Sequence, residues 1–311
     1  MQVHYDITQL PVFKNAVITI GTFDGVHSGH QQIIQQLLTE AKAINGETVV
    51  VTFHPHPKMV VVSVKQNIKV LNTLDEKITL LAKHGIHHLV VVPFTQGFAE
   101  QTADTYINNF LVAKFHPHTI IIGYDHKFGA GRQGDYHLLE AQAPANNFIV
   151  KEIPEHVLQS ITISSTKIRE ALLKGDIQTA NEFLGYHYFF SGKVVEGNKL
   201  GRTIGYPTAN LLIEDEHKLI PGNGVYAVKV VTDELLALPF KGMMNVGVRP
   251  TIGGTTKRVI EVNIFDFDKD IYGTTLMVTI KQKLRDEVKF NGLNELKQQL
   301  AKDKEDCLKC W

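Results

Sequence analysis

The sequence predicts two closely joined domains: an α/β domain with a parallel sheet over residues 1–184, and a small antiparallel β-barrel with a C-terminal helix over residues 185–311. The length of 311 residues suits two domains, since one domain typically takes about 150. In the first part, apolar strand-like runs alternate with helical patterns, which is typical of a parallel sheet covered on both faces. In the second part, glycines and prolines separate short strand-like runs, which favours a barrel or sandwich.

The expected strands of the first domain are short runs rich in Val, Ile and Thr. Val17–Phe23 is the first, and the helix that follows, Gln31–Ile44, carries its apolar residues on one stripe. Parallel strands joined through helices require right-handed crossovers. The remaining expected strands and helices are Thr48–Phe53, Asp75–His84, His88–Phe94, Thr102–Ala113, Thr119–Tyr124 and Phe148–Ile153.

The second domain follows a helical connector at Asp176–Leu184. Its strand-like runs are bounded by turn residues, and Leu293–Lys302 carries the long helical pattern that is expected to close the barrel. The expected strands are Tyr188–Glu196, Gly224–Val231, Phe240–Val246, Val259–Phe265 and Leu276–Ile280.

Charge and cysteine content restrict the class of protein. Lysine plus arginine and aspartate plus glutamate each total 32, which argues against broad electrostatic adhesion to nucleic acid or to a membrane of anionic lipid. The apolar runs are shorter than the roughly 20 residues of a membrane-spanning helix, and no signal peptide is recognisable. The two cysteines, Cys307 and Cys310, exclude a disulfide framework, so a cytoplasmic enzyme is expected, with the terminal CLKC in a frayed tail. The oligomeric state is left open.

A turn between the first strand and the first helix carries two histidines. In an open α/β sheet, ligands bind at the carboxyl ends of strands, and a helix N-terminus attracts phosphate. The segment Gly21–His30 reads GTFDGVHSGH, and its glycines allow the backbone to approach a ligand closely. His27 and His30 are three residues apart, so both imidazoles can face one phosphoryl group and donate hydrogen bonds to it. The alternative is two surface histidines beside a glycine-rich turn.

A second polar segment, ISSTKIR, follows the last strand of the first domain and opens a helix. The hydroxyl groups of Ser164, Ser165 and Thr166 can cap that helix and contact phosphate. Arg169, one turn later, supplies a planar cation. An ordinary helix cap with a solvated arginine fits the same pattern, so the segment alone leaves both interpretations open.

Gly129–Gly134 matches the G-x-G-x-x-G pattern of dinucleotide-binding turns. That fingerprint belongs immediately after the strand of the first βα turn, whereas this match follows the fourth strand at a distance. We therefore interpret Gly123–Asp135 as a flexible ligand-binding loop whose polar members are Asp125, Lys127 and Arg132.

The segments GTFDGVHSGH, GYDHKFGAGRQGD and ISSTKIREAL, in that order, resemble the adenylyltransferase half of bacterial bifunctional riboflavin kinase/FAD synthetases. That half is a Rossmann-like nucleotidyltransferase of the His-x-Gly-His type. The resemblance implies transfer of AMP from ATP to FMN, with magnesium and with release of pyrophosphate. It implies a catalytic role for His27 and His30 and a place for Asp125 between nucleotide and flavin. The ATP contacts that it implies are Gly21, Phe23, Asp24, His27, His30, Ser164, Ser165, Thr166 and Arg169.

The sequence departs from that family at two positions. His126 stands where an aromatic residue often follows the aspartate, and His54 stands where an acid commonly precedes Pro-His-Pro. These departures concern the expected flavin contacts. Metal binding by the histidines of HPHP, His87–His88 or His116–His118 was a further possibility, but none has a carboxylate or cysteine at matching spacing.

The densest motif of the chain is Gly197–Asn210, GNKLGRTIGYPTAN. It is not a Walker A loop, because that pattern needs one more residue and a lysine where Arg202 stands. Glycines at four-residue intervals still let backbone amides surround phosphate oxygens. Thr208 and Asn210 supply hard oxygen ligands, which suit magnesium. The alternative is a glycine-rich β-turn with ordinary polar residues.

Glu261 interrupts an apolar strand in the run VIEVNI. A carboxylate inside a barrel is costly unless it has a partner or a function. A general base for a hydroxyl nucleophile requires such a group near the transferred phosphate. Because strand residues alternate between faces, a different register places Glu261 on the outside of the barrel, and the pattern leaves both possibilities open.

Residues 188–303 resemble the riboflavin kinase half of the same bifunctional family. The matching segments are GKVVEGNKLGRTIGYPTANL, GVYAV, MNVGVRPT, the strand of Glu261 and LRDEVKFNGLNEL. The resemblance implies a six-stranded barrel, with Glu261 as the base toward the ribityl 5′-hydroxyl and with Arg285 and Glu287 near the flavin. It also implies that Thr208 and Asn210 bind magnesium. The implied ATP contacts are Gly197, Gly201, Arg202, Gly205, Thr208 and Asn210.

The two halves together predict an enzyme that phosphorylates riboflavin to FMN in the C-terminal domain and adenylylates FMN to FAD in the N-terminal one. ATP and the flavins are then substrates, and Mg²⁺ is the cofactor. There are two alternatives. The chain keeps only the kinase activity, or it is a non-enzymatic flavin-binding regulator. A nicotinamide-dependent oxidoreductase rests on Gly129–Gly134 alone.

Overall fold

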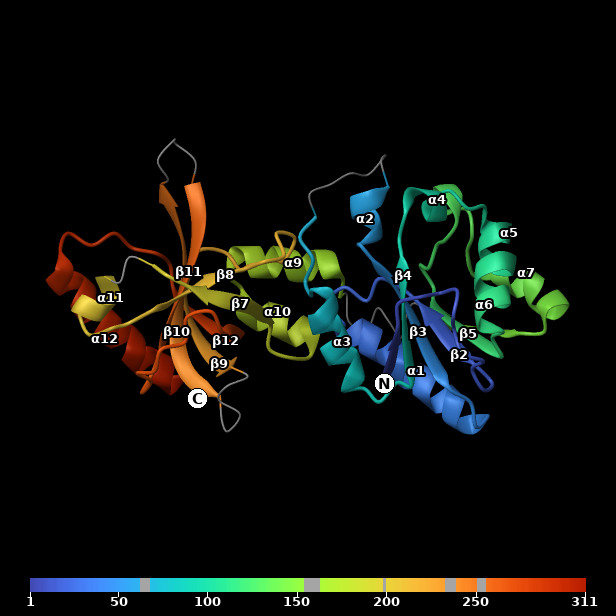
Figure 1. The fold of residues 1–311 in the computed structure, drawn as a ribbon, viewed down its shortest axis with the longest axis horizontal. Helices are drawn as coiled ribbons and strands as arrows, with labels where there is room; N and C mark the ends of the chain where they lie inside the picture. Colours follow the sequence, from blue (N-terminus) through green and yellow to red (C-terminus); the bar gives the residue numbers. More distant parts are fainter. Residues whose placement is uncertain (62–67, 154–162, 198–199, 233–238, 251–255) are drawn as a thin grey trace. The chain divides into compact units, whose positions relative to one another are not determined.

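The computed structural model describes two compact units, Met1–Ser165 and Thr166–Trp311. Figure 1 shows both, and each is described by itself. Among the described residues, no helix combines the length and the apolar character needed to cross a membrane. The description covers residues 1–311 apart from 62–67, 154–162, 198–199, 233–238 and 251–255.

The first unit is built on a six-stranded sheet with the order β1-β4-β3-β2-β5-β6, in which every pair of neighbours is parallel. The predicted α/β class with a parallel sheet is therefore confirmed. The strands are β1 Gln2–His4, β2 Val17–Ile20, β3 Thr48–His54, β4 His88–Pro93, β5 Thr119–Gly123 and β6 Ile149–Ile153.

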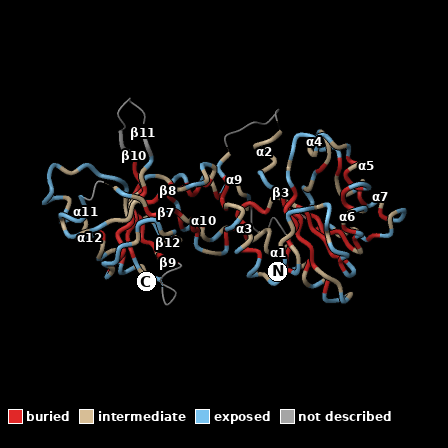
Figure 2. The backbone as a smooth tube through the Cα atoms, in the orientation of Figure 1, coloured by how far each residue is buried: buried red, intermediate tan, exposed pale blue. Residues whose placement is uncertain are grey.

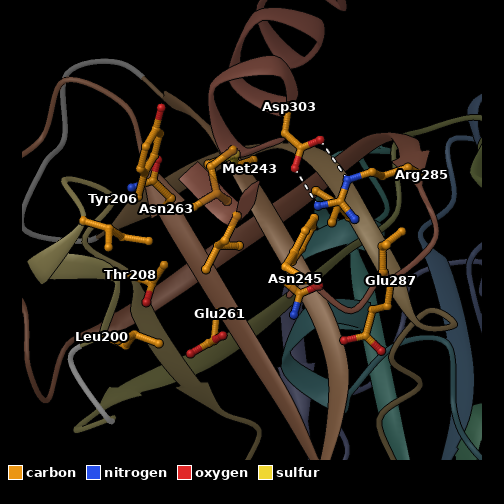
Figure 3. A pocket seen from close by; sticks show the side chains of 17 residues that line it. Leu200, Tyr206, Thr208, Met243, Asn245, Glu261, Asn263, Arg285, Glu287 and Asp303 are labelled. Carbon is orange, nitrogen blue, oxygen red and sulfur yellow. Dashed lines mark hydrogen bonds and ion pairs between the residues drawn. The ribbon is translucent and has the colours of Figure 1, made fainter. Parts of the chain in front are cut away.

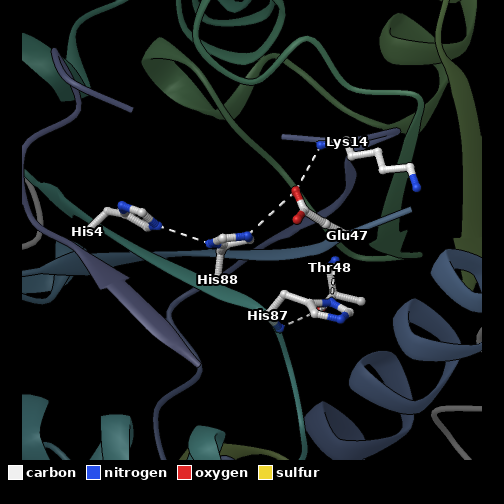
Figure 4. Close-up of polar contacts among 6 residues, drawn as sticks. All are labelled: His4, Lys14, Glu47, Thr48, His87 and His88. Carbon is white, nitrogen blue, oxygen red and sulfur yellow. Dashed lines mark hydrogen bonds and ion pairs between the residues drawn. The ribbon is translucent and has the colours of Figure 1, made fainter. Parts of the chain in front are cut away.

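Strand β1 has no counterpart among the predicted strands. It has three residues, none of them buried, so it gives no apolar run. It forms one edge of the sheet by pairing with β4, and His4 Nε2 lies 3.1 Å from His88 Nδ1 (Figure 4). The Nε2 atom of His88 lies 3.7 Å from a carboxylate oxygen of Glu47, which also accepts a hydrogen bond from the Lys14 amide.

The helices of the first unit agree with the prediction at α1 and α3 and differ elsewhere. The predicted helix at Thr102–Ala113 contains a seven-residue π-helical segment, η2. Helix α7 was not predicted, because Pro144 lies inside it and its apolar residues are not periodic. The segments are α1 Ser28–Ala43, α2 Pro57–Val60, α3 Leu74–Ala82, α4 Gln96–Ala99, α5 Ala103–Thr105, η2 Tyr106–Val112, α6 Ala113–Phe115, η3 Ala130–Arg132 and α7 Tyr136–Asn146.

The core of the first unit follows the strands, as the red stretches of Figure 2 show. Strands buried on both faces read as nearly continuous apolar runs, and this is why VITI, VVV and TIII were recognisable in the sequence. Their carboxyl ends carry the loops described below.

The second unit is a closed barrel with the order β10-β11-β8-β7-β12-β9, in which all six pairings are antiparallel. The predicted barrel with a C-terminal helix is confirmed. Strand β8 was missed in the prediction because it has only four residues and begins within the end of the polar GNKLGRTIGYPTAN motif. The segments are α9 Ser165–Lys174, α10 Ile177–Leu184, β7 Phe189–Val195, α11 Leu200–Thr203, β8 Ala209–Leu212, β9 Gly224–Thr232, β10 Phe240–Pro250, β11 Thr256–Ile264, β12 Thr275–Arg285 and α12 Leu293–Lys309.

Helices α9 and α10 belong almost entirely to the second compact unit, whereas the sequence assigns them to the first domain. Asn181 of α10 donates to the carbonyl oxygen of Ile280 on β12, and its own amide oxygen accepts from the Tyr188 N–H. A boundary at residue 184 remains a prediction.

Helix α12 covers part of the outer face of the barrel. Along β9, β10 and β11, residues such as Val228, Met244 and Val262 are fully buried inside the barrel, and their neighbours in sequence point outward. Cys307 of α12 is fully buried against outward-facing Met243, and its thiol donates to the Gly242 carbonyl. The expected frayed tail was therefore wrong, because the last turns of α12 pack on the barrel.

Candidate active sites

The first site is the turn between β2, which ends at Ile20, and α1, which begins at Ser28. Its backbone is unusual: φ is +47° at Phe23, +90° at Gly25 and +39° at Val26. Such values are costly for residues with a Cβ atom, so surrounding contacts must hold this conformation. The result is a compact turn at the N-terminus of α1, the position at which helices bind phosphate.

The two histidines of this turn lie face to face. The rings of His27 and His30 are stacked, with centroids 3.7 Å apart and an interplanar angle of 17°. Phe23 also packs against His30, with ring centroids 5.1 Å apart. Burial, then the nearby His27 and Lys77, lower the pKa of His30 well below its ordinary value, so this imidazole is neutral at neutral pH. A neutral imidazole can donate one hydrogen bond without adding a like charge to the stack.

This turn lies where the strand order reverses. From β2 the chain moves to β3 and β4 on one side and returns to β5 on the other, so β2 and β5 are adjacent. Ligands of open α/β sheets bind at such switch points, outside the carboxyl ends of the strands. The loop Gly123–Asp135, which follows β5, therefore begins beside the histidine turn.

Two of the predicted ATP contacts, Gly21 and Asp24, bind residues outside the turn. The Asp24 carboxylate, 2% exposed, accepts a hydrogen bond from the Leu71 amide, and the Asp24 carbonyl accepts one from the Ser165 hydroxyl at 2.9 Å. The amide of Gly21 donates to the Val51 carbonyl. The structure thus joins Ser165, which is distant in sequence, to the histidine turn. Ser164 is exposed and stays a prediction, as do Thr166 and Arg169 of the second unit.

The loop after β5 is closed by hydrogen bonds of its own, and its predicted flexibility stays a prediction. The backbones of Phe128 and Gly134 exchange hydrogen bonds of 3.0 and 2.9 Å, and Lys127 pairs with Asp135 at 3.0 Å. The glycines of the G-x-G-x-x-G match, Gly129–Gly134, thus lie in a short turn that these hydrogen bonds close. Asp125 is exposed, and its place between nucleotide and flavin stays a prediction. Phe128 stacks on Tyr106, with ring centroids 5.0 Å apart.

The second site is a pocket of about 210 Å³ on the outer face of the barrel, beneath α12 (Figure 3). Its walls combine apolar side chains with a few amide, hydroxyl and charged groups, which is typical of small-molecule sites. Among the described residues, those that line it are Leu200, Gly201, Ile204, Tyr206, Thr208, Val225, Met243, Asn245, Glu261, Asn263, Arg285, Glu287, Val288, Phe290, Leu296, Leu300 and Asp303.

Glu261 lies on the outer face of β11, and this decides between the two registers that the sequence left open. Its neighbours Ile260 and Val262 are buried in the barrel. On β8 it lies directly opposite Asn210, and on β10 directly opposite Asn245. Directly opposite residues share a face of the sheet, with Cβ atoms about 5 Å apart. A carboxylate between two amides, beneath the cover of α12, is positioned in a pocket rather than in open solvent.

The glycine-rich motif approaches the same end of the pocket. A Cβ atom at Gly197 would collide with the Asn210 amide, and one at Gly201 would collide with the Tyr206 carbonyl oxygen, so both glycines are needed for close backbone approach. Gly205 has φ +86°. Thr208 lines the pocket, whereas Arg202 is exposed on α11.

The residues at this end fit a magnesium ion that also binds phosphate oxygens. The Thr208 hydroxyl, the Asn210 amide oxygen and the Glu261 carboxylate are hard oxygen donors from adjacent segments. Among the described residues, no group of three or more His, Cys, Asp or Glu side chains could hold a metal by itself. This composition suits Mg²⁺, which keeps several waters and substrate oxygens in its coordination sphere.

The opposite side of the pocket is held by a partly buried ion pair, drawn with dashed lines in Figure 3. Arg285 donates from Nε and Nη2 to the two carboxylate oxygens of Asp303, at 2.8 and 2.7 Å. The guanidinium also lies 5.8 Å from the ring centre of Phe290. Glu287 accepts a hydrogen bond from Asn223. Asp303 was not predicted, because within the polar sequence LKQQLAKDKEDC it is indistinguishable from an exposed helix residue.

The first unit also contains a buried lysine that the sequence did not reveal. Lys77, 7% exposed, donates from Nζ to the Thr22 carbonyl oxygen at 2.7 Å and to the Thr52 hydroxyl at 3.3 Å. In the sequence it belongs to an ordinary helical stretch, LDEKITLLA, with no signal that sets it apart.

The fold and the two sites define a nucleotide-dependent transferase with one centre in each unit. A family model of FAD synthetase matches residues 10–167, and one of riboflavin kinase matches residues 184–311. The chain belongs to the bifunctional riboflavin kinase/FMN adenylyltransferase family.

Similar proteins span the whole chain. The bifunctional riboflavin kinase/FMN adenylyltransferase of Haemophilus influenzae is 40% identical, over 94% of each chain. That of Escherichia coli K12 is 36% identical over 96% of this chain and 93% of its own, and that of Listeria monocytogenes is 38% identical over 94% and 91%. A solved structure described as a macrolide-efflux protein from Streptococcus pneumoniae superimposes with a TM-score of 0.86, at 31% identity and with 97% of each chain covered.

Proposed function

We propose that this chain carries out two consecutive reactions. In the barrel, the γ-phosphoryl group of ATP is transferred to riboflavin to give FMN and ADP. In the α/β unit, the AMP part of a second ATP is transferred to FMN to give FAD and pyrophosphate. The observation that supports this most strongly is the presence, in one chain, of a histidine turn at a sheet switch point and a carboxylate–amide pocket beneath α12.

The kinase step requires a base and a phosphate cradle. Glu261 accepts the proton of the ribityl 5′-hydroxyl as that oxygen attacks the γ-phosphorus, and ADP leaves. The backbone of the Gly197–Asn210 motif and the hydroxyl of Thr208 hold the phosphates. A bound Mg²⁺ would neutralise charge on the phosphate oxygens, and Thr208 and Asn210 would hold it. The apolar wall formed by residues such as Val225, Met243 and Leu300 fits a flat flavin ring.

The adenylyl step needs positioned donors and no covalent intermediate with the protein. The FMN phosphate attacks the α-phosphorus of ATP, and pyrophosphate leaves. His27 and His30 donate hydrogen bonds to the oxygens on which negative charge grows, and the N-terminus of α1 adds its positive dipole end. Ser164, Ser165, Thr166 and Arg169 complete the phosphate contacts in this proposal, and Asp125 lies toward the flavin.

Riboflavin, FMN and ATP are the partners that this proposal requires. Cytoplasmic location is supported by the free thiols of Cys307 and Cys310. The net charge of zero supports the expectation that nucleic acid and membranes are not partners.

The position of a radioactive label in ATP tests the two reactions separately. With riboflavin and γ-labelled ATP, we expect labelled FMN. With unlabelled FMN and α-labelled ATP, we expect labelled FAD and unlabelled pyrophosphate. Labelled FMN without FAD would reduce the chain to a kinase, and flavin binding without either product would favour the regulator.

A further inference from the structure

Lys77 occupies a place that is unfavourable for a lysine. It is the fourth residue of α3, after the N-cap Thr73, and so lies in the first turn, where the helix dipole repels a cation. It is also buried, which penalises the charged form. The start of α3 is fixed independently by a capping box, in which Thr73 and Glu76 exchange backbone and side-chain hydrogen bonds. Lys77 is therefore not needed as a cap.

Both hydrogen bonds of Lys77 lead to the histidine turn. The carbonyl that it binds belongs to Thr22, the residue directly before Phe23, where φ becomes positive. The second acceptor, the Thr52 hydroxyl on β3, donates in turn to the same Thr22 carbonyl at 3.1 Å. A charged donor and a hydroxyl thus fix the oxygen at the point where the strained part of the turn begins.

The charged and titratable groups around Lys77 come from the elements packed on it. Burial lowers the pKa of Lys77 to about 8, although Asp24 of the turn acts in the opposite direction and favours the charged lysine. His30 of α1 lies near enough for Lys77 to lower its pKa. Glu76, the neighbour on α3, is engaged in the capping box. At pH 7 the lysine is therefore mostly protonated, and it faces a neutral His30.

We propose that Lys77 is a positioning residue for adenylyl transfer, which fixes the turn whose φ is positive at Phe23, Gly25 and Val26, so that His27 and His30 face the transferred phosphoryl group. It acts through the turn and does not itself reach the substrate. This inference rests on the proposed adenylyl transfer in the first unit. It predicts that the charge and the hydrogen bond of Lys77, rather than its bulk, determine the rate.

The test compares Lys77→Met with Lys83→Met, an exposed lysine at the C-cap of the same helix. FAD formation from supplied FMN is measured as kcat and KM. For Lys77→Met we expect kcat to fall about 10²-fold with a smaller change in KM for ATP, because the lost contacts serve the transition state. FMN formation from riboflavin by the same protein should keep its wild-type rate, and Lys83→Met should match wild type in both reactions.

A pH profile and a conservative variant separate positioning from simple support of the fold. In the wild type, kcat for FAD formation should decline as pH rises through about 8, where Lys77 loses its proton. Lys77→Arg should retain more activity than Lys77→Met and should lack this decline, because arginine stays charged.

Three results would overturn the proposal. The first is a wild-type kcat for FAD formation in Lys77→Met. The second is a loss of FAD formation in Lys77→Met that equals the fraction of molecules in which the first unit is unfolded, as measured by hydrogen exchange of the sheet amides. The third is an alkaline decline that persists in Lys77→Arg. If the wild-type protein makes no FAD from FMN, the proposed function fails and the Lys77 role fails with it; FAD formation by the wild type with any of the three results rejects Lys77 alone.

Discussion

Glu261 of β11 lies directly opposite Asn210 of β8, on the outer face of the barrel. The cross-strand pair places a proton acceptor beside an amide oxygen that suits magnesium, at a separation of about 5 Å between Cβ atoms. At this separation, the base can act on the attacking hydroxyl while the metal ligand holds a magnesium ion at the phosphates of ATP. The pair links a residue of the glycine-rich motif to one 51 positions later in a different strand, and this geometry supports the kinase assignment.

The first prediction concerns the base. Glu261→Gln should lower FMN formation about 10²- to 10⁴-fold, because the amide cannot accept the proton of the attacking hydroxyl. FAD formation from supplied FMN should be unchanged. Product chromatography from riboflavin and from FMN gives both rates, with the exposed Glu305→Gln as control. A wild-type rate of FMN formation would remove Glu261 from this role.

His30→Ala should have the opposite effect. We expect a decrease of about 10²- to 10³-fold in FAD formation, because a donor toward the developing charge is lost, with FMN formation intact. The exposed His137→Ala serves as control. An unchanged yield of FAD would show that the stacked pair of histidines is not part of the chemistry.

Magnesium binding by Thr208 can be tested by titration. Thr208→Ala should raise several-fold the magnesium concentration that gives half-maximal FMN formation, because one oxygen ligand is removed. Thr275→Ala, at an exposed position of β12, should leave the titration unaltered. Superimposable titrations of Thr208→Ala and wild type would contradict metal ligation by this residue.

The ion pair of Arg285 and Asp303 should stabilise the second unit. Asp303 is 3% exposed and accepts both bonds, so Asp303→Ala leaves a partly buried guanidinium unpaired. We expect the free energy of unfolding to fall by about 3 kcal/mol, since Arg285 keeps some access to water. Urea unfolding followed through the fluorescence of Trp311, the one tryptophan of the chain and part of the second unit, measures this. Asp306→Ala, which removes an exposed ion pair with Lys309, should have little effect; equal changes in the two variants would contradict the account.

His4 of β1 and His88 of β4 should make the first unit sensitive to acid (Figure 4). Burial, and then the nearby His88, lower the pKa of His4. Burial also lowers the pKa of His88, and this outweighs the opposite effect of the Glu47 carboxylate. A folded-state pKa below the unfolded value of about 6.5 means that the unfolded chain binds more protons. The stabilisation is complete above pH 6.5 and is lost as the pH falls below it.

Urea midpoints at pH 7.5 and 5.5 test this sign. The difference should be smaller in a His4→Gln, His88→Gln double variant than in wild type, while His137→Gln should keep the wild-type difference. The same or a larger difference in the double variant would reject the assignment.

Much of the fold could be predicted because its determinants are local. Val17–Ile20 and Thr119–Gly123 are strands buried on both faces, so their apolar runs are continuous and recognisable. Strand β1 and helix α7 lack such a pattern: one has three partly exposed residues, and the other contains Pro144. Their pairing and packing come from tertiary contacts that no local pattern records.

The candidate sites divide in the same way. His27 and His30 stand out because they lie in a glycine-rich motif, and Glu261 stands out because it interrupts an apolar strand. Lys77 and Asp303 lie in sequences typical of exposed helix faces, and they are distinguished only by burial against partners distant in sequence. The face of the barrel on which Glu261 lies depends on strand register, which the alternation of apolar residues left open.

The most direct test of the central claim is a time course of the purified protein with riboflavin, ATP and magnesium, analysed by chromatography. Two consecutive reactions in one chain predict that FMN rises first and then declines as FAD accumulates. FMN that accumulates without FAD, or riboflavin that stays unchanged, would contradict the assignment of two activities to this chain.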